Sequence, residues 1–301
     1  MEEILIIISI IILVYFIYKL NKSLNEGKIV TTESFTSDYE LPKVIYGFWD
    51  DYDENKIIQS HIRSWERKIS PDWKIIMLNK NNVYKYVESS FITKYGSGTL
   101  DPTRFADFLR IDLLKNRGGC WMDASIFLTD GKFLDDMHKE MVNNKYDACF
   151  YEYKENTLLT SQPHIDNWFM MAPKNSKIIT DLYYEFDRAY EMDFLKYKEK
   201  VIIPSGILLD KTIGYGDSTY LMQHAIFHYL FKIGNKYNIL LKNATDSMYK
   251  LQILYGWNHE KVIEFILKNS NWDRLYGIKL TKGNRAAITD VDKYVDKINS
   301  L

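Results

Sequence analysis

Residues 101–125 constrain the fold of this 301-residue chain strongly, because they specify a helix, a tight turn and a strand in succession. Asp101 is a favourable N-cap, and Pro102 suits the first position of a helix. A pair of glycines then ends the helix and lets the backbone turn. The strand that follows carries Asp123 to the edge of a sheet, where the ligands of α/β proteins collect. We therefore expect a helix face and a strand end to converge on one ligand.

The segments before this helix alternate between strand and helix patterns. Residues 43–49 and 73–78 are rich in β-branched and aromatic side chains, and residues 56–68 between them have helical spacing of apolar side chains. A strand, a helix and a second strand in this order predict a βαβ unit and a parallel sheet. The later segments predict a strand or strand-turn, a further strand and three helices, at residues 120–128, 148–151, 176–190, 218–233 and 260–268.

Composition excludes several functional classes. With 46% hydrophobic residues, the chain can bury the core of one catalytic domain of about 250 residues. Lys and Arg total 39 and Asp and Glu total 40, so a net charge of -1 offers no basic surface for nucleic acid. The sequence contains no phosphate-binding loop of the GxxxxGK[ST] type, which argues against an ATP-driven enzyme. Cys120 and Cys149 are expected to be free thiols.

The N-terminal segment differs from the rest of the chain. Residues 4–20 form an almost unbroken apolar run, about the shortest that spans a bilayer. Acids precede the run and lysines follow it, which does not fit a cleaved signal peptide. We predict a membrane anchor at residues 1–22, a polar linker at 23–40 and a catalytic domain at 41–301. The charge that follows the span favours a cytosolic domain. A buried core helix is the alternative for the apolar run.

Three charged side chains of the predicted helix share one face. Arg104, Asp107 and Arg110 are spaced three residues apart, so that a carboxylate lies between two guanidiniums. A sugar nucleotide requires a carboxylate for sugar hydroxyls, a cation for the diphosphate and an acid that holds Mg²⁺ or Mn²⁺. Asp107, Arg110 and Asp123 match these requirements. The structural alternative is a surface helix with an ion pair, a glycine cap and an edge-strand acid, each of which is common alone.

The same residues resemble a known family. ADFLR at residues 106–110, GG at 118–119 and WMDAS at 121–125 are similar to the SDxLR...GGxWxDAT pattern of capsular polysaccharide synthesis proteins. That family is related to the DxD-containing sugar transferases, which include yeast mannosyltransferases and the glucosylating clostridial toxins. Weaker likenesses extend the resemblance over most of the domain, at residues 41–49, 64–65, 71–73, 167–169 and 277–281.

The resemblance implies a GT-A type, Rossmann-like domain with a mixed, mostly parallel sheet and helical additions. It also implies a nucleoside diphosphate sugar as donor and Mn²⁺ or Mg²⁺ as cofactor. Asp107 would contact ribose or donor-sugar hydroxyls, Arg110 the diphosphate or the sugar, and Asp123 the metal and the nucleotide. An aromatic residue after the first strand would stack on the base. The donor-binding residues so implied are Tyr46, Trp49, Arg104, Asp107, Arg110, Gly119, Asp123, Ser125, His224 and Lys279.

Ser125 is the main departure from the DxD motif of the related sugar transferases. It stands where DxD has its second acid, and a hydroxyl is a weaker, neutral ligand. The sequence therefore predicts a metal site at Asp123 and Ser125, but it leaves the affinity for a metal, and even the need for one, open. Asp130 is an alternative second ligand for the metal, but its spacing from Asp123 does not establish this role.

Several other polar residues have more than one interpretation. His224 and His228 are four residues apart on a predicted helix, and core packing, a place in the pocket and zinc ligation all stay open. Lys279 is a candidate to close over the diphosphate, with a solvated lysine as the alternative. His164 and Asp166 lie in a predicted loop and have no predicted role.

We hypothesise that the chain transfers a hexose-type sugar to a hydroxyl of a glycan or lipid-linked acceptor near a membrane, with Asp123, Asp107 and Arg110 as catalytic residues. One alternative is a catalytically silent, membrane-tethered glycan- or nucleotide-binding protein, which predicts donor binding that is indifferent to Mn²⁺ and no transfer. Another is a sugar-phosphate transferase, which predicts an extra phosphate in the product mass. No motif specifies the sugar, the base, the acceptor or the oligomeric state.

Overall fold

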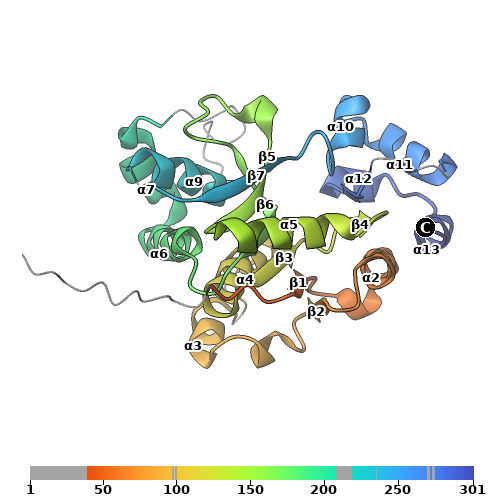
Figure 1. Cartoon of the computed structure of the whole chain (residues 1–301), viewed down its shortest axis with the longest axis horizontal. Helices are drawn as coiled ribbons and strands as arrows, with labels where there is room; N and C mark the ends of the chain where they lie inside the picture. The colour runs from red at the N-terminus through yellow and green to blue at the C-terminus, as the bar shows by residue number, and fades with distance from the viewer. Residues whose placement is uncertain are drawn as a thin grey trace, which may run out of the picture. The chain divides into compact units, whose positions relative to one another are not determined.

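A six-stranded mixed sheet forms the centre of the computed structural model (Figure 1). The structure describes residues 39–96, 98, 100–207, 219–234, 236–269, 272 and 275–301, and residues 40–301 make up one compact unit. The strands of the sheet, in spatial order, are β2 (Lys74–Leu78), β1 (Val44–Phe48), β3 (Gly119–Met122), β6 (Ile165–Ala172), β5 (Ala148–Glu152) and β7 (Ile239–Asn243).

The direction of the strands determines which residues meet at one edge. β1 is parallel to β2 and to β3, β5 is parallel to β7, and β6 is antiparallel to both of its neighbours. This confirms the prediction of an α/β fold with a mixed, mostly parallel sheet. The carboxyl ends of β1 and β3 therefore lie at the same edge as the beginning of β6. The backbone N–H of Asp123 donates to the carbonyl of Trp168 at 2.8 Å, which ties the end of β3 to β6.

Helices cover both faces of the sheet. Buried side chains of α4, α6 and α9 form one core with those of β1, β3, β5 and β6. On the other face, Phe133 of α5 packs against Phe169 of β6, and α5 crosses in front of the sheet in Figure 1. The helices are α2 (Lys56–Lys68), α3 (Ser89–Phe91), α4 (Pro102–Arg117), α5 (Lys132–Asn144), α6 (Lys177–Met192), α7 (Phe194–Tyr197), α9 (Met222–Lys232), α10 (Lys250–Leu254), α11 (His259–Lys268), α12 (Lys282–Ala286) and α13 (Val291–Asn299).

The helix that the sequence specified best, α4, has the predicted ends. Asp101 Oδ1 accepts hydrogen bonds from the backbone N–H groups of Thr103 and Arg104 at 2.9 and 3.2 Å. Gly118 ends the helix with φ 68°, and a Cβ there would lie 2.6 Å from the backbone nitrogen of Lys174. Only glycine fits this turn without displacing the chain.

A second, smaller sheet lies beside the end of β3. The predicted strand at residues 120–128 is interrupted after Met122, and β4 (Ile126–Leu128) then pairs antiparallel with β8 (Gly277–Lys279). The register sets Ile126 opposite Lys279. Two short strands that are distant in the sequence thus bring a lysine beside the turn at Asp123 and Ser125.

We predicted that His164 and Asp166 lie in a loop. The prediction is wrong for Asp166, which is the second residue of β6. The predicted anchor at residues 1–22 and almost all of the linker at 23–40 lie outside the described residues. Among the helices that the structure does describe, none has the length and apolar character needed to span a bilayer.

Candidate functional site

The charged face of α4 forms as predicted, and Asp107 lies at its centre. Nη1 of Arg104 donates to Oδ2 of Asp107 at 3.0 Å, and Nη1 of Arg110 lies 3.5 Å from Oδ1. Asp107 is 4% exposed, so both of its oxygens are held by cations away from bulk water. Burial raises the pKa of Asp107 to about 6, although Arg110 and Arg104 oppose the shift.

Arg110 connects the helix to the end of β3. Its Nη2 lies 3.4 Å from Oδ1 of Asp123, and its Nη1 donates to the carbonyl of Asn167 at 2.8 Å. The guanidinium also lies over the ring of Trp121, 5.2 Å from the ring centroid. The structure therefore brings Asp107, Arg110 and Asp123 together, as the sequence predicted.

Lys279 completes this group from the small sheet. Its Nζ donates to Oδ2 of Asp123 at 2.8 Å and to Oγ of Ser125 at 2.5 Å. Burial alone would raise the pKa of Asp123, but Lys279 and Arg110 hold it below its ordinary value. Arg104, Asp107, Arg110, Asp123 and Lys279 are hereafter called the ion network.

The metal site predicted at Asp123 and Ser125 does not fit the arrangement of these side chains. Oδ2 of Asp123 and Oγ of Ser125 both accept hydrogen bonds from the ammonium of Lys279. Oδ1 of Asp123 accepts one from Nε1 of Trp121 at 2.9 Å. A divalent cation prefers several oxygen ligands and is repelled by an ammonium group a few ångströms away. The pair thus binds a lysine where a metal was expected.

Of the two aromatic residues predicted to stack on a base, Trp49 is the one at this edge. It directly follows β1, is half-buried, and lies 5.1 Å from the guanidinium carbon of Arg285, measured to its ring centroid. Tyr46 instead lies within β1 opposite Trp121 and is buried in the core, so the structure does not support a contact with the base. Both faces of β1 are covered, and alternation along the strand directs Tyr46 to the core.

Gly119 also has a different role from the predicted one. It opens β3, at the opposite end of the strand from Asp123, with φ 110°. A Cβ there would lie 2.8 Å from the carbonyl oxygen of Val44. Gly119 therefore lets the backbones of β1 and β3 approach each other, away from the strand end that carries Asp123.

Two amides that were given no predicted role support the network. Nδ2 of Asn167 donates to Oδ1 of Asp107 at 3.2 Å and to Oε1 of Gln223 at 2.8 Å. Nε2 of Gln223 donates to the backbone carbonyl of Asp107 at 2.6 Å. Asn167 belongs to residues 167–169, one of the weaker likenesses to the family, and this likeness was the only indication of it in the sequence analysis. Gln223 had no signal, because its contact depends on how α9 packs against α4.

His224, predicted as a pocket, core or metal residue, lies beside Asp166. Its Nε2 is 3.9 Å from Oδ1 of Asp166, and the ring of His164 is 5.3 Å away between centroids. Ligand atoms of these three buried residues all lie within 4.8 Å of one another. Burial raises the pKa of Asp166 to about 7. His164, Asp166 and His224 are hereafter called the histidine cluster, which the sequence did not predict.

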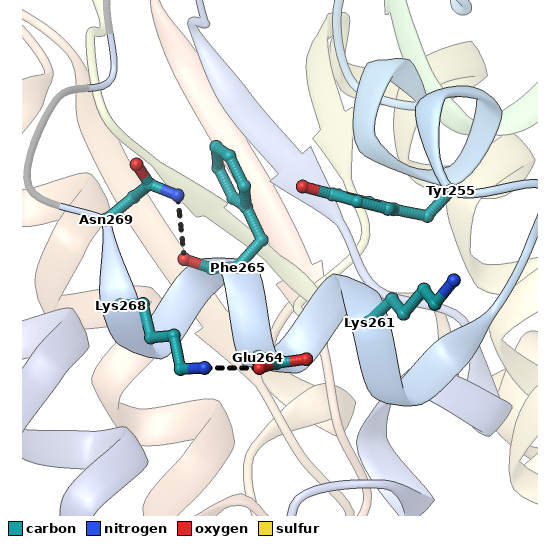
Figure 2. A pocket seen from close by; sticks show the side chains of 6 residues that line it. All are labelled: Tyr255, Lys261, Glu264, Phe265, Lys268 and Asn269. Carbon is teal, nitrogen blue, oxygen red and sulfur yellow. Dashed lines mark hydrogen bonds and ion pairs between the residues drawn. The ribbon is translucent and has the colours of Figure 1, made fainter.

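A surface pocket of about 380 Å³ lies elsewhere, beside α11. Figure 2 shows its lining, in which Lys268 pairs with Glu264 and the amide of Asn269 donates to the carbonyl of Phe265. None of the predicted site residues contributes to it. The pocket lacks the joined carboxylates and guanidiniums of the ion network, and we assign it no part in the chemistry.

Comparison with known proteins gives one family. The model described as "Capsular polysaccharide synthesis protein" matches residues 13–203. The chain is also similar to O-glycosyltransferase braB of Annulohypoxylon truncatum, with 34% identity over 110 residues. That similarity covers 33% of this chain and 25% of the relative, so the chain aligns with only a quarter of that protein.

Comparison with solved structures gives distant likenesses to glycosyltransferases. GlyE of Streptococcus pneumoniae TIGR4 has 12% identity and a TM-score of 0.43, covering 87% of this chain and 64% of its own. The galactosyltransferase LgtC, solved with donor and acceptor sugar analogues, has 10% identity and a TM-score of 0.43 at 86% and 96% coverage. TM-scores below 0.5 do not establish a shared fold.

Proposed function

This chain belongs to the capsular polysaccharide synthesis protein family, and on that premise we propose that it is a nucleotide-sugar-dependent glycosyltransferase with a GT-A type domain. The observation that carries the proposal is the position of Arg110, whose guanidinium lies 3.5 Å from Asp107 and 3.4 Å from Asp123. A helix face and a strand end thereby form one charged group at the carboxyl edge of β1 and β3, which is where α/β proteins bind nucleotides.

Each part of the ion network suits one part of a nucleoside diphosphate sugar. Asp107 is an acceptor for hydroxyls of the ribose or the donor sugar, and its pairing with Arg104 and Arg110 fixes its orientation. Arg110 and Lys279 supply positive charge for the diphosphate. Trp49 offers an aromatic face for the base. These assignments follow the roles that the family resemblance implies.

The proposed reaction moves one hexose-type sugar. The bond between the anomeric carbon and the diphosphate oxygen breaks, and the nucleoside diphosphate leaves with the electron pair. A hydroxyl of a glycan or lipid-linked acceptor forms the new bond to that carbon and releases its proton. The fixed cations stabilise the charge that develops on the departing diphosphate. The apolar run at residues 4–20 supports an acceptor at a membrane surface, with the domain on the cytosolic side.

A thermal-shift screen of nucleoside diphosphate sugars tests the proposal. A ligand that binds only the folded state stabilises it, by about 2.7 kcal/mol at a hundred times its Kd. We expect one base and sugar combination to raise the Tm of the full chain, and Trp49→Leu to reduce the rise. Tyr184→Leu is the matched control, because Tyr184 is an exposed aromatic residue of α6. A screen in which no nucleotide sugar raises the Tm contradicts the proposal.

Product analysis completes the test. We expect the mass of the acceptor to increase by one hexose residue. An increase that includes a phosphate identifies a sugar-phosphate transferase instead, and donor binding without any product identifies a silent binding protein.

A further inference from the structure

Resting on the proposed function, we infer that the ammonium of Lys279 is the fixed cation that receives the donor diphosphate, in the position that a divalent metal takes in DxD enzymes. The inference begins from the two oxygens that would bind the metal. Lys279 Nζ lies 2.8 Å from Asp123 Oδ2 and 2.5 Å from Ser125 Oγ, so it occupies the space between them.

The fold holds Lys279 in this position from several sides. Pairing of β4 with β8 sets Lys279 opposite Ile126, and the N–H of Leu280 donates to the carbonyl of Ser125 at 3.0 Å. Nε2 of Gln252 donates to the carbonyl of Lys279 at 2.6 Å. The Lys279 side chain is 12% exposed. A lysine fixed in this way has already lost most of the conformational entropy that a flexible surface lysine loses when it binds a ligand.

The number of protons on the ammonium leaves room for a ligand. An ammonium carries three N–H donors. Within the described part of the chain, Asp123 and Ser125 accept two of them. The third is available to a phosphate oxygen. Asp123 then has the role of orienting the cation, and Ser125 needs only a hydroxyl to do the same.

The substitution of serine for an acid is explained by this arrangement. A divalent metal requires anionic ligands to offset its two charges, so DxD has two acids. An ammonium has one charge, which the single carboxylate of Asp123 offsets. A second carboxylate at position 125 would cancel the charge intended for the diphosphate. Ser125 therefore matches a lysine better than it matches a metal.

A second cation lies close to the same group. Arg285 donates through Nη1 to the carbonyl of Leu280 at 2.8 Å, and its guanidinium lies over Trp49. Burial lowers the pKa of both Lys279 and Arg285, and Asp123 is the main group that opposes the shift in each. Arg104, Arg110 and Lys279 lie within 3.5 Å of the carboxylates of Asp107 and Asp123, and Arg285 adds a fourth positive charge that Asp123 stabilises. This excess of positive charge suits a diphosphate without any metal.

The test is isothermal titration of the full chain with uridine, guanosine, adenosine and cytidine diphosphates, in EDTA and in Mn²⁺. We expect one of them to bind with the same Kd in both buffers, within about twofold. Lys279→Met should raise that Kd by about 10- to 100-fold in both buffers, which is the usual effect of losing a charge-assisted hydrogen bond. Lys279→Arg keeps the charge and should recover part of the affinity.

Lys242→Met is the matched control, because Lys242 also pairs with a carboxylate, Glu140, at 2.8 Å but on the edge strand β7. It should leave the Kd unchanged. Binding by the wild-type chain that requires Mn²⁺ overturns the inference and leaves the proposed function intact, and this result needs no variant. Absence of binding to any nucleoside diphosphate in either buffer overturns both. Sugar transfer by the wild-type chain in EDTA excludes a silent binding protein.

Discussion

Asp123 and Asp166 lie at the same edge of the sheet but have opposite electrostatic environments. Asp123 follows β3, and Asp166 is near the start of the adjacent strand β6. Both are desolvated by the surrounding protein, which disfavours a carboxylate. Yet the pKa of Asp123 is lowered, because Lys279 and Arg110 outweigh the effect of burial. Burial raises the pKa of Asp166 to about 7, against a smaller opposing effect of His164.

The comparison teaches that burial and contact with fixed cations compete at each carboxyl. The cations prevail at Asp123, whereas at Asp107 they only limit the rise in pKa that burial causes. In the ion network each carboxylate has at least two cations within 3.5 Å. In the histidine cluster, Nε2 of His224 lies 3.9 Å from Oδ1 of Asp166. We therefore expect the ion network to depend on charge and the histidine cluster to tolerate its loss.

The largest expected effect is on stability, from Arg110→Met. The substitution removes the guanidinium shared by the buried carboxylate of Asp107 and the partly buried carboxylate of Asp123, and leaves each with one cation, Arg104 and Lys279. Breaking a buried ion pair costs up to about 3 to 5 kcal/mol. Asp166→Asn should change the free energy of unfolding by less than about 1 kcal/mol, because the pKa of Asp166 is about 7, so that its protonated form, which the amide resembles, is as stable as the ionised form at pH 7. Urea denaturation at pH 7 measures both.

Equal losses in the free energy of unfolding for Arg110→Met and Asp166→Asn would remove the distinction between the ion network and the histidine cluster. Arg110→Lys is the informative intermediate, because it keeps a charge but not the planar fork that reaches both carboxylates. It should recover only part of the loss.

The second prediction concerns turnover. Asp123→Asn keeps the shape of the side chain but removes the charge that orients Lys279, and loss of such an electrostatic group lowers kcat by about 10²- to 10³-fold. Asp166→Asn should lower kcat by less than about tenfold. Transfer rates of the purified variants with the identified donor, with folding checked by circular dichroism, provide the measurement. Full turnover by a folded Asp123→Asn variant would exclude the proposed mechanism.

The local part of the ion network follows from the spacing of its residues, whereas the distant member, Lys279, was available only as a candidate from the likeness to the family. Asp107 and Arg110 share a helix face by their spacing, and the turn after α4 directs β3 and Asp123 toward them. Lys279 is 156 residues from Asp123, and its position depends on the pairing of two three-residue strands. Such short strands leave almost no periodicity in a sequence. The sequence therefore named Lys279 as a candidate, but it did not predict the contact of Lys279 with Asp123 and Ser125.

The failures elsewhere have related causes. Asp166 was expected in a loop because polar residues stand near the start of β6, at its second and third positions. The apolar residues that follow them do not alternate with polar ones, because both faces of the strand are buried. Tyr46 and Trp49 were both candidates for the base because the likeness to the family implies an aromatic residue after the first strand, and the strand pattern did not separate the two. Sequence patterns identify a buried strand well, but they do not say which of its faces a residue occupies.

The smallest predicted effect, and the most direct test of the comparison, is the pH dependence of donor binding. Asp107 must be ionised to keep its pairs with Arg104 and Arg110, and its folded-state pKa is about 6, above the ordinary value of 3.8. A carboxyl whose pKa is raised on folding binds its proton more tightly in the folded state. Lowering the pH from 7 to 5 therefore protonates Asp107 without destabilising the fold through this group.

Donor affinity should consequently fall as the pH drops through about 6, approaching a tenfold loss per unit below it, and Asp107→Asn should bind more weakly but with a flat profile. Isothermal titration between pH 5 and 8 measures this. Asp166 has a pKa of about 7 and is the competing source of such a profile. If Asp166→Asn abolishes the pH dependence while Asp107→Asn retains it, the histidine cluster, and not the ion network, governs binding, because only the group whose ionisation the donor requires transmits its pKa to the affinity.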